Sequence, residues 1–173
     1  MKLKDIYKLA LNRINAKEGD KQVEGVVMSG INAAIKLIAT QSKKSKSVTV
    51  TVAKNIPFTL PDDFLSLSML LTTAGMKLSD NDFYLDSNFI LISDTELVGG
   101  LTMLYNYIPV DMVLATDGDK QPDVKAIYHS ALAAYGAYMF HTISGSGAAS
   151  IFLNEFNAIT QLEKPASAVQ TKK

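Results

Sequence analysis

Two groups of aspartates are the residues of this chain whose spacing most readily suggests chemistry. Asp62 and Asp63 are adjacent, and a pair of carboxylates is a common arrangement for general acid–base catalysis. Adjacent side chains usually point in different directions, however, and no third polar partner stands near them in the sequence. We therefore expect one of the two to cap the turn that follows Pro61 and the other to be solvated.

The second group lies in residues 117–123, where the sequence DGDKQPD superficially resembles a calcium-binding loop. An EF-hand loop has Gly at its sixth position and Glu at its twelfth. Counted from Asp117, these positions hold Pro122 and Tyr128, so the pattern fails at both. A solvated turn followed by a helix cap explains these acids, and we predict no metal site here.

The remaining candidates for chemistry are weaker. His129 and His141 lie twelve residues apart on one predicted helix, so that helix alone cannot bring them to one metal ion. Ser144–Gly147 has the composition of a phosphate-binding loop, but it follows a helix and lacks the Lys of such loops, which favours a helix–helix linker. The chain has no Cys, which excludes disulfides and thiolate chemistry. We therefore predict no catalytic residue, no cofactor and no enzymatic activity.

The composition is that of a globular protein able to bury one good core. The chain has 173 residues, of which 47% are hydrophobic and 20% charged. Its first residues lack the apolar segment of a signal peptide, and no stretch reaches the roughly 18 uninterrupted apolar residues of a membrane span. We expect a soluble protein that is made in a cytoplasm and does not enter membranes.

The net charge of zero conceals an uneven distribution. Residues 1–60 carry 11 Lys and Arg against 4 Asp and Glu, whereas residues 61–123 carry 2 Lys against 11 Asp and Glu. Segments of opposite sign can face one another within one fold, or they can form complementary faces between subunits. Nucleic-acid binding is a further interpretation, which would use the basic run Lys43–Lys46, although this run lacks interleaved aromatic residues.

Helical patterns occupy residues 1–46. Asp5 and Asp20 each stand where they could cap a helix, and apolar residues from Val23 to Ile38 follow a helical period. Gly25 and Gly30 lower the helix propensity of this second helix, and their small size would let another backbone come close.

Residues 47–118 form a β-rich insert in this interpretation. Val and Thr alternate from Ser47 to Val52, and further short strands are predicted at residues 67–73, 83–85, 89–92 and 101–108, with turns between them. Residues 119–163 return to helix, opening at Pro122, and residues 164–173 form a polar tail. The sequence predicts the α+β fold class: a bundle of about four helices with an inserted small antiparallel β-sheet or sandwich.

With these elements placed, the chain resembles the head-to-tail connector proteins of tailed bacteriophages, also called adaptor or head completion proteins. The resemblance covers roughly residues 1–162. It depends on IPFTLPDDFL at residues 56–65, on YNYIP at 105–109, and on DKQPD at 119–123 leading into ALAAYGAY at 131–138. The order and spacing of these stretches are more specific than any one of them.

The resemblance implies a structural protein of the virion neck, made in the host cytoplasm. Such proteins form a ring of about twelve copies between the portal at the capsid vertex and the tail, and they extend the DNA channel, with transient non-specific contact to DNA. Small residues Ala133, Ala134 and Ala137 are the candidate subunit interface. The tail is the candidate portal-contacting segment, with Pro165, Val169, Lys172 and Lys173 as its candidate residues.

Three other functions stay open at this point. Another neck or tail component, such as a tail-completion or terminator protein, would share the layout. A small ligand-binding or hydrolytic domain would use Asp62, Asp63 or residues 117–123. A nucleic-acid regulator would use the basic run at residues 43–46.

Overall fold

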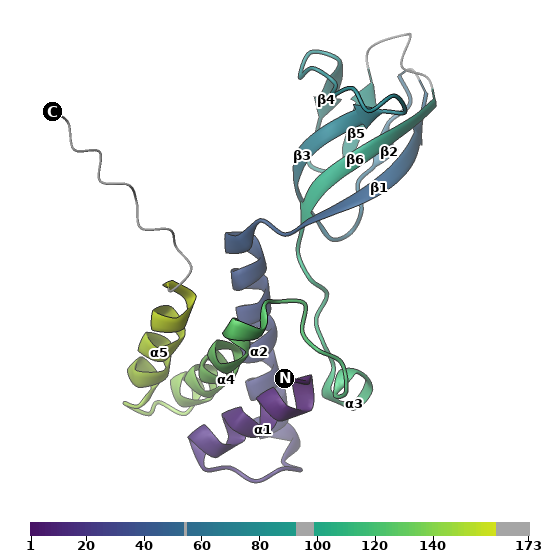
Figure 1. Cartoon of the computed structure of the whole chain (residues 1–173). Helices are drawn as coiled ribbons and strands as arrows, with labels where there is room; N and C mark the ends of the chain where they lie inside the picture. The colour runs from purple at the N-terminus through teal and green to yellow at the C-terminus, as the bar shows by residue number, and fades with distance from the viewer. Residues whose placement is uncertain (54, 93–98, 162–173) are drawn as a thin grey trace, which may run out of the picture. The chain divides into compact units, whose positions relative to one another are not determined.

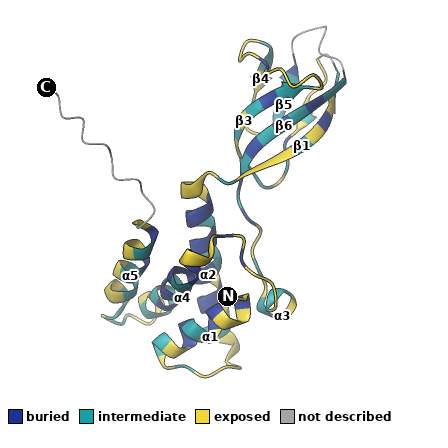
Figure 2. Cartoon of the chain, viewed as in Figure 1, coloured by how far each residue is buried: buried dark blue, intermediate teal, exposed yellow. Residues whose placement is uncertain are grey.

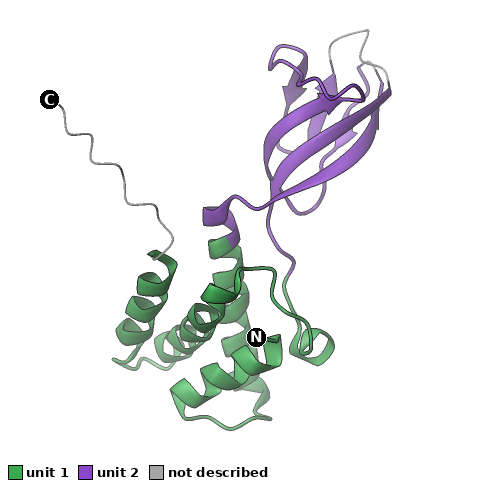
Figure 3. Ribbon diagram, in the orientation of Figure 1, with its two compact units in different colours: residues 1–38, 111–173 green, residues 39–110 purple. Residues whose placement is uncertain are grey.

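The computed structural model describes residues 1–53, 55–92 and 99–161. The chain forms two compact units (Figure 3). The helical unit combines Met1–Ile38 with Asp111–Lys173, and the β unit is Ala39–Val110. The described residues contain five α-helices and two antiparallel sheets of three strands each, which confirms the predicted α+β class.

The helices of the first 42 residues begin near their expected caps, whereas the helix expected at Pro122 begins later. The bounds of the described helices are α1 Leu3–Ile14, α2 Lys21–Ser42, α3 Leu114–Asp117, α4 His129–Ile143 and α5 Ala149–Gln161 (Figure 1). Asp20 caps α2 as expected, because one carboxylate oxygen accepts the backbone N–H groups of Gln22 and Val23 at 2.9 and 3.2 Å. Asp5 lies inside α1 and accepts the N–H of Lys2 at 3.2 Å.

A pair of glycines sets the closest approach between helices. A Cβ atom built on Gly30 of α2 would lie 2.9 Å from the Cα of Gly136 in α4, nearer than side chains tolerate. The predicted backbone approach is therefore confirmed at Gly30, whereas Gly25 has open space around it. Helix α4 also packs against α1 and α5, and an ion pair between Arg13 and Glu155 joins α1 to α5.

Helix α2 is long and apolar enough to cross a membrane, with a mean hydropathy of 1.3 over its best window. The core helix of a soluble protein passes the same test. Val27, Ile31 and Ile35 of α2 are almost fully buried in the core of the helical unit, so its apolar character has a use within this fold.

The helix expected to open at Pro122 begins later, which corrects that prediction. Pro122 is buried and its carbonyl accepts the N–H of Val124 at 2.8 Å, a tight turn that is incompatible with a helix start. A short 3₁₀ turn, Ala126–Tyr128, then leads into α4 at His129. Val124 and Tyr128 follow the helical period because both are buried in the core, although neither lies in α4.

The β unit follows the sequence pattern closely. Its strands are β1 Ser45–Val52, β2 Phe58–Thr59, β3 Phe64–Thr72, β4 Phe83–Leu85, β5 Phe89–Ile92 and β6 Gly99–Tyr107. One sheet has the order β1-β6-β3 and the other β2-β5-β4, with all neighbours antiparallel. Strand β1 pairs with β6 along its whole length, from Ser45 opposite Asn106 to Val52 opposite Gly99.

The two sheets share one core, so the sandwich form of the prediction applies. Alternate residues of β6, Leu101, Met103, Tyr105 and Tyr107, are buried, as Figure 2 shows by colour along the strand. Side chains of the other sheet, such as Ile90, belong to the same buried cluster. This period of two is the pattern from which the strands were predicted.

The structure draws the boundaries of the insert differently from the predicted 47–118. Residues 111–118 belong to the helical unit, where the side chain of Asn32 exchanges two hydrogen bonds with the backbone of Met112, at 3.0 and 2.9 Å. Lys36 also pairs with Asp111 at 2.8 Å. Because of these contacts, the chain rejoins the helical unit at Asp111, before the predicted end of the insert at residue 118. No local sequence pattern reveals these contacts.

Candidate functional site

Asp63 forms a polar cluster with side chains of two strands of the β unit. Its Oδ2 lies 2.6 Å from Nζ of Lys46 on β1, and its Oδ1 accepts the hydroxyl hydrogen of Tyr105 on β6 at 2.9 Å. The carboxylate is only 17% exposed. The same Lys46 ammonium lies 4.0 Å from the ring centre of Tyr107, a cation–π distance. Side chains from three segments therefore meet at one carboxylate.

The backbone at this point binds the two ends of the β unit together. The carbonyl of Asp63 accepts the N–H of Ile108 at 2.9 Å, and the carbonyl of Lys44 accepts the N–H of Tyr107 at 3.1 Å. The chain enters the β unit near Lys44 and leaves it after Ile108. The Asp63 cluster, which we define as Lys46, Asp63, Tyr105 and Tyr107, thus fastens the entering strand to the leaving strand.

The ionisation of the Asp63 cluster favours a structural role over acid–base catalysis. Burial by itself would raise the pKa of Asp63. The hydrogen bonds from Lys46 and Tyr105 together lower this pKa by more than burial raises it, so the pKa of Asp63 lies below the usual range. Burial and the neighbouring carboxylate raise the pKa of Tyr105. At neutral pH the carboxylate is charged and the phenol protonated, so neither group titrates where a proton-transfer catalyst would.

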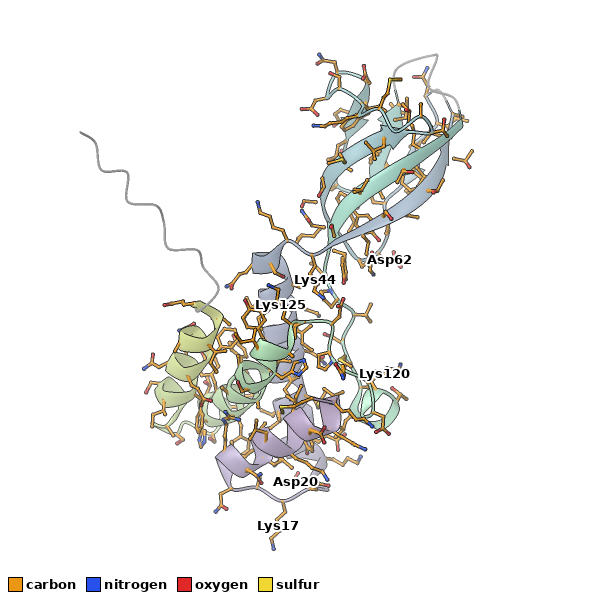
Figure 4. All side chains as sticks on the ribbon, viewed as in Figure 1. Lys17, Asp20, Lys44, Asp62, Lys120 and Lys125 are labelled. Atoms are coloured by element: carbon orange, nitrogen blue, oxygen red, sulfur yellow. The ribbon has the colours of Figure 1, made fainter. Side chains whose placement is uncertain are left out.

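Of the two roles predicted for the adjacent aspartates, the structure confirms the solvated one and not the turn cap. Asp62, labelled in Figure 4, is exposed as expected for a solvated residue. The turn after Pro61 also forms, with the N–H of Phe64 donating to the Pro61 carbonyl at 2.9 Å. Asp63, in contrast, is held in the ion pair with Lys46, a partner that the sequence placed 17 residues away.

Asp117 and Asp119 of residues 117–123 are also engaged by lysines of the chain. Asp117 accepts the N–H of Val113 at 2.8 Å and pairs with Lys120 at 2.6 Å. Asp119 lies 3.0 Å from the ammonium of Lys2 and 2.7 Å from that of Lys4. These hydrogen bonds lower the pKa of Asp119 to about 2. The segment is an ion-paired loop that attaches the start of α1.

These ion pairs bear on the uneven charge distribution. Lys2, Lys36 and Lys46 belong to the basic first 60 residues, and their partners Asp119, Asp111 and Asp63 belong to the acidic segment. Part of the charge asymmetry is therefore neutralised within the fold, in line with the first of the two interpretations. Lys46 of the basic run at residues 43–46 is one of these paired lysines, so its charge is partly neutralised by Asp63.

Both histidines are packed against other side chains. His129 is 3% exposed, its Nδ1 lies 2.6 Å from the Met1 nitrogen, and burial lowers its pKa. The ring of His141 stacks on Phe152 with 5.2 Å between ring centroids. Within the described residues, no three His, Asp or Glu side chains gather as the ligands of one metal ion would.

The candidate subunit interface needs correction. Ala133, Ala134 and Ala137 are 0% exposed, because α4 is covered on these faces by the other helices of the same chain. Their small side chains serve packing within the helical unit, and they are not available to a second copy in this fold. The candidate portal-contacting residues Pro165, Val169, Lys172 and Lys173 lie outside the described residues.

An exposed apolar surface of the helical unit was missed from the sequence. A cavity of about 310 Å³ is lined mainly by Val23, Val26, Phe140 and Ile143. Ile143 is 65% exposed, and Ile151, at the start of α5, is 64% exposed. Both isoleucines flank the connection between α4 and α5. We call Val23, Val26, Phe140, Ile143 and Ile151 the hinge-end surface. No sequence signal distinguishes Ile151 from apolar residues of the same helix that are buried, such as Phe156.

No protein-family model matches this chain, and a comparison with curated proteins finds no significant match.

Proposed function

We propose that this chain is a structural protein of the bacteriophage neck. In this proposal about twelve copies form a ring that joins the portal at the capsid vertex to the tail and extends the DNA channel. Its partners are further copies of itself, the portal protein and a tail or tail-completion protein. Contact with the genome is transient and non-specific. The ring would be located in the virion neck after synthesis in the host cytoplasm.

The observation that carries the proposal is the hinge-end surface. Ile143 is about two-thirds exposed and lines an apolar cavity, and Ile151 is exposed to the same degree. Exposed large apolar side chains of this kind are typical of a protein interaction site. A ring needs two different faces that meet head to tail, and the hinge-end surface can supply one of them. Leu37 and Ile127, 42% and 47% exposed, are apolar side chains elsewhere on the helical unit that can contribute to the other.

The layout of the chain supports the same proposal. The helical unit is built from both ends of the chain, and the β unit is inserted as a separate compact unit. In the connectors that the chain resembles, helices pack between neighbours and a β-rich part projects from the ring. A neck protein of this kind needs a rigid base and a separate contact module, which the two units can provide.

The ion pairs refine what kind of contact joins the subunits. Lys2, Lys36 and Lys46 are engaged by aspartates of their own chain, so these charges contribute little to a contact between copies. We therefore expect subunit contacts to be mainly apolar, and ring formation to depend only weakly on salt concentration.

The test is the mass of the purified protein, measured by mass photometry with and without a portal ring encoded by the same genome. The proposal expects rings of about a dozen subunits, formed alone at high concentration or on the portal. A monomer that ignores the portal at all concentrations would contradict it. Rings that need the tail protein in place of the portal would favour a tail-completion or terminator protein.

A further inference from the structure

The β unit has an open side that the ring proposal does not use. β3 is an edge strand of one sheet and β4 an edge strand of the other. Residues 76–78 already pair with the end of β3, because the N–H of Leu78 donates to the Leu70 carbonyl and the N–H of Thr72 to the Met76 carbonyl, both at 2.9 Å. The part of the β3 edge that stays open is therefore residues 64–69. A cavity of about 370 Å³ lies between them, and its lining combines Leu67 and Leu70 of β3 with Phe83 and Leu85 of β4. The two sheets therefore open toward the same side, and the entrance to their core lies between two strand edges.

This side carries more exposed apolar side chains than β1 does. Met76 is 66% exposed, Tyr84 57% and Leu85 40%. β1, the edge strand on the other side of the first sheet, exposes the polar residues Ser47, Thr49 and Thr51. Polar side chains commonly protect an edge strand against pairing with another chain. The β3–β4 side has fewer such side chains than β1.

The same side is acidic. Asp80, Asp82 and Asp86 border the strands, and only Lys77 offers a nearby positive charge among the residues described here. Asp82 accepts the N–H of Ser79 at 2.7 Å, and Asp86 accepts the hydroxyl hydrogen of Ser87 at 2.9 Å. Their partners are neutral groups, so the three charges are not cancelled by a lysine or arginine that the structure describes.

We propose that the β3–β4 edge binds an extended, Lys- or Arg-bearing segment of a partner protein as an added strand. Main-chain hydrogen bonds to the edge would supply affinity, an apolar side chain of the segment would fill the cavity, and its cationic side chains would approach the three aspartates. The inference goes beyond ring formation and does not depend on it, because the site lies within one β unit.

Two features favour a basic partner segment over the same edge of a second copy. Edge-to-edge pairing of two copies would bring two sets of aspartates together, and like charges repel. The pairing of β3 with β6 also shifts register between Phe64 and Ser66 and between Leu67 and Met69. Such irregularities disfavour a long continuous pairing between two edges but leave room for a short segment.

The test is an NMR titration of the ¹⁵N-labelled full chain with two blocked peptides of alternating Val and Thr. One peptide has Lys at both ends and the other has Glu. We expect the Lys peptide to bind about tenfold more tightly at low salt. Its binding should shift the amide signals of residues 66–69 and 83–85 and leave those of β1 unchanged.

Matched charge reversals test the site further. Asp80→Lys places a cation at the acidic edge, whereas Asp62→Lys makes the same change at an exposed position of the same unit outside that edge. We expect Asp80→Lys to weaken binding of the Lys peptide about threefold or more and Asp62→Lys to leave it near the wild-type value. Equal binding of the two peptides, signal changes centred elsewhere, equal effects of the two substitutions, or no binding at millimolar peptide would each overturn the proposal.

Discussion

At the scale of single residues, Asp63 is the carboxylate of the β unit that joins side chains of two strands. Replacing it in Asp63→Asn removes the charge that Lys46 and Tyr105 contact, in a side chain that is only 17% exposed. We expect the free energy of unfolding of the β unit to fall by about 1 to 3 kcal/mol, the range for hydrogen bonds to charged groups. Urea unfolding combined with hydrogen exchange of the β6 amides measures this loss.

The pH dependence follows from the lowered pKa of Asp63. A carboxylate with a lower pKa in the folded state stabilises the fold fully above its unfolded pKa, about 3.9, and loses that contribution as pH falls through the folded pKa. The difference between wild type and Asp63→Asn should therefore be constant near neutral pH and shrink below about pH 4. Asp62→Asn is the control, since Asp62 is exposed, and a loss as large as that of Asp63→Asn would contradict the assigned role.

At the scale of elements, the crossing of α2 and α4 depends on Gly30. A Cβ there would lie 2.9 Å from the Cα of Gly136, from the Cγ of Met139 and from the carbonyl oxygen of Tyr135. Two of these atoms are backbone and cannot move aside cheaply. We expect Gly30→Ala to lower the free energy of unfolding by about 1 to 3 kcal/mol, although Ala is the better helix former. Circular dichroism during urea unfolding measures it.

Gly25→Ala in the same helix is the matched control. No atom lies within 4 Å of a Cβ built at Gly25, so only the gain in helix propensity remains. We expect this variant to be more stable by up to about 1 kcal/mol. If both substitutions changed stability in the same direction and to the same extent, the close crossing at Gly30 would not be the cause.

At the scale of the whole molecule, the proposed ring places the hinge-end surface between copies of the chain. Ile143→Asp and Ile151→Asp each place a charge on a side chain that is about two-thirds exposed. We expect the fold of the single chain to change by less than about 0.5 kcal/mol, as is usual for surface positions. Assembly should need about tenfold more protein, because a buried contact would then contain an unpaired charge. Sedimentation velocity measures the shift.

Asn154→Asp serves as the comparison for these two variants, since it adds the same charge on an exposed position of α5. Its assembly should match the wild type. An equal defect in Asn154→Asp would point to a general charge effect, and wild-type assembly of both isoleucine variants would remove the hinge-end surface from the proposed ring.

The sequence by itself determined the elements whose signals are local. The Val–Thr alternation of residues 47–52 and the apolar runs at 83–85 and 89–92 predicted strands that the structure contains. The cap at Asp20 was equally predictable. In each case the pattern lies within a few residues, because strand period, turn composition and capping depend on neighbours along the chain.

The tertiary structure alone decided what each element faces. The alanine face of α4 was predicted to meet another subunit and is instead covered by helices of its own chain, while Ile151 of α5 is exposed although Phe156 of the same helix is buried. Asp63 acquired its role from Lys46 and Tyr105, which are 17 and 42 residues away. A periodic pattern shows that a face must be covered, but the partner that covers it is chosen by long-range packing, which local spacing does not encode.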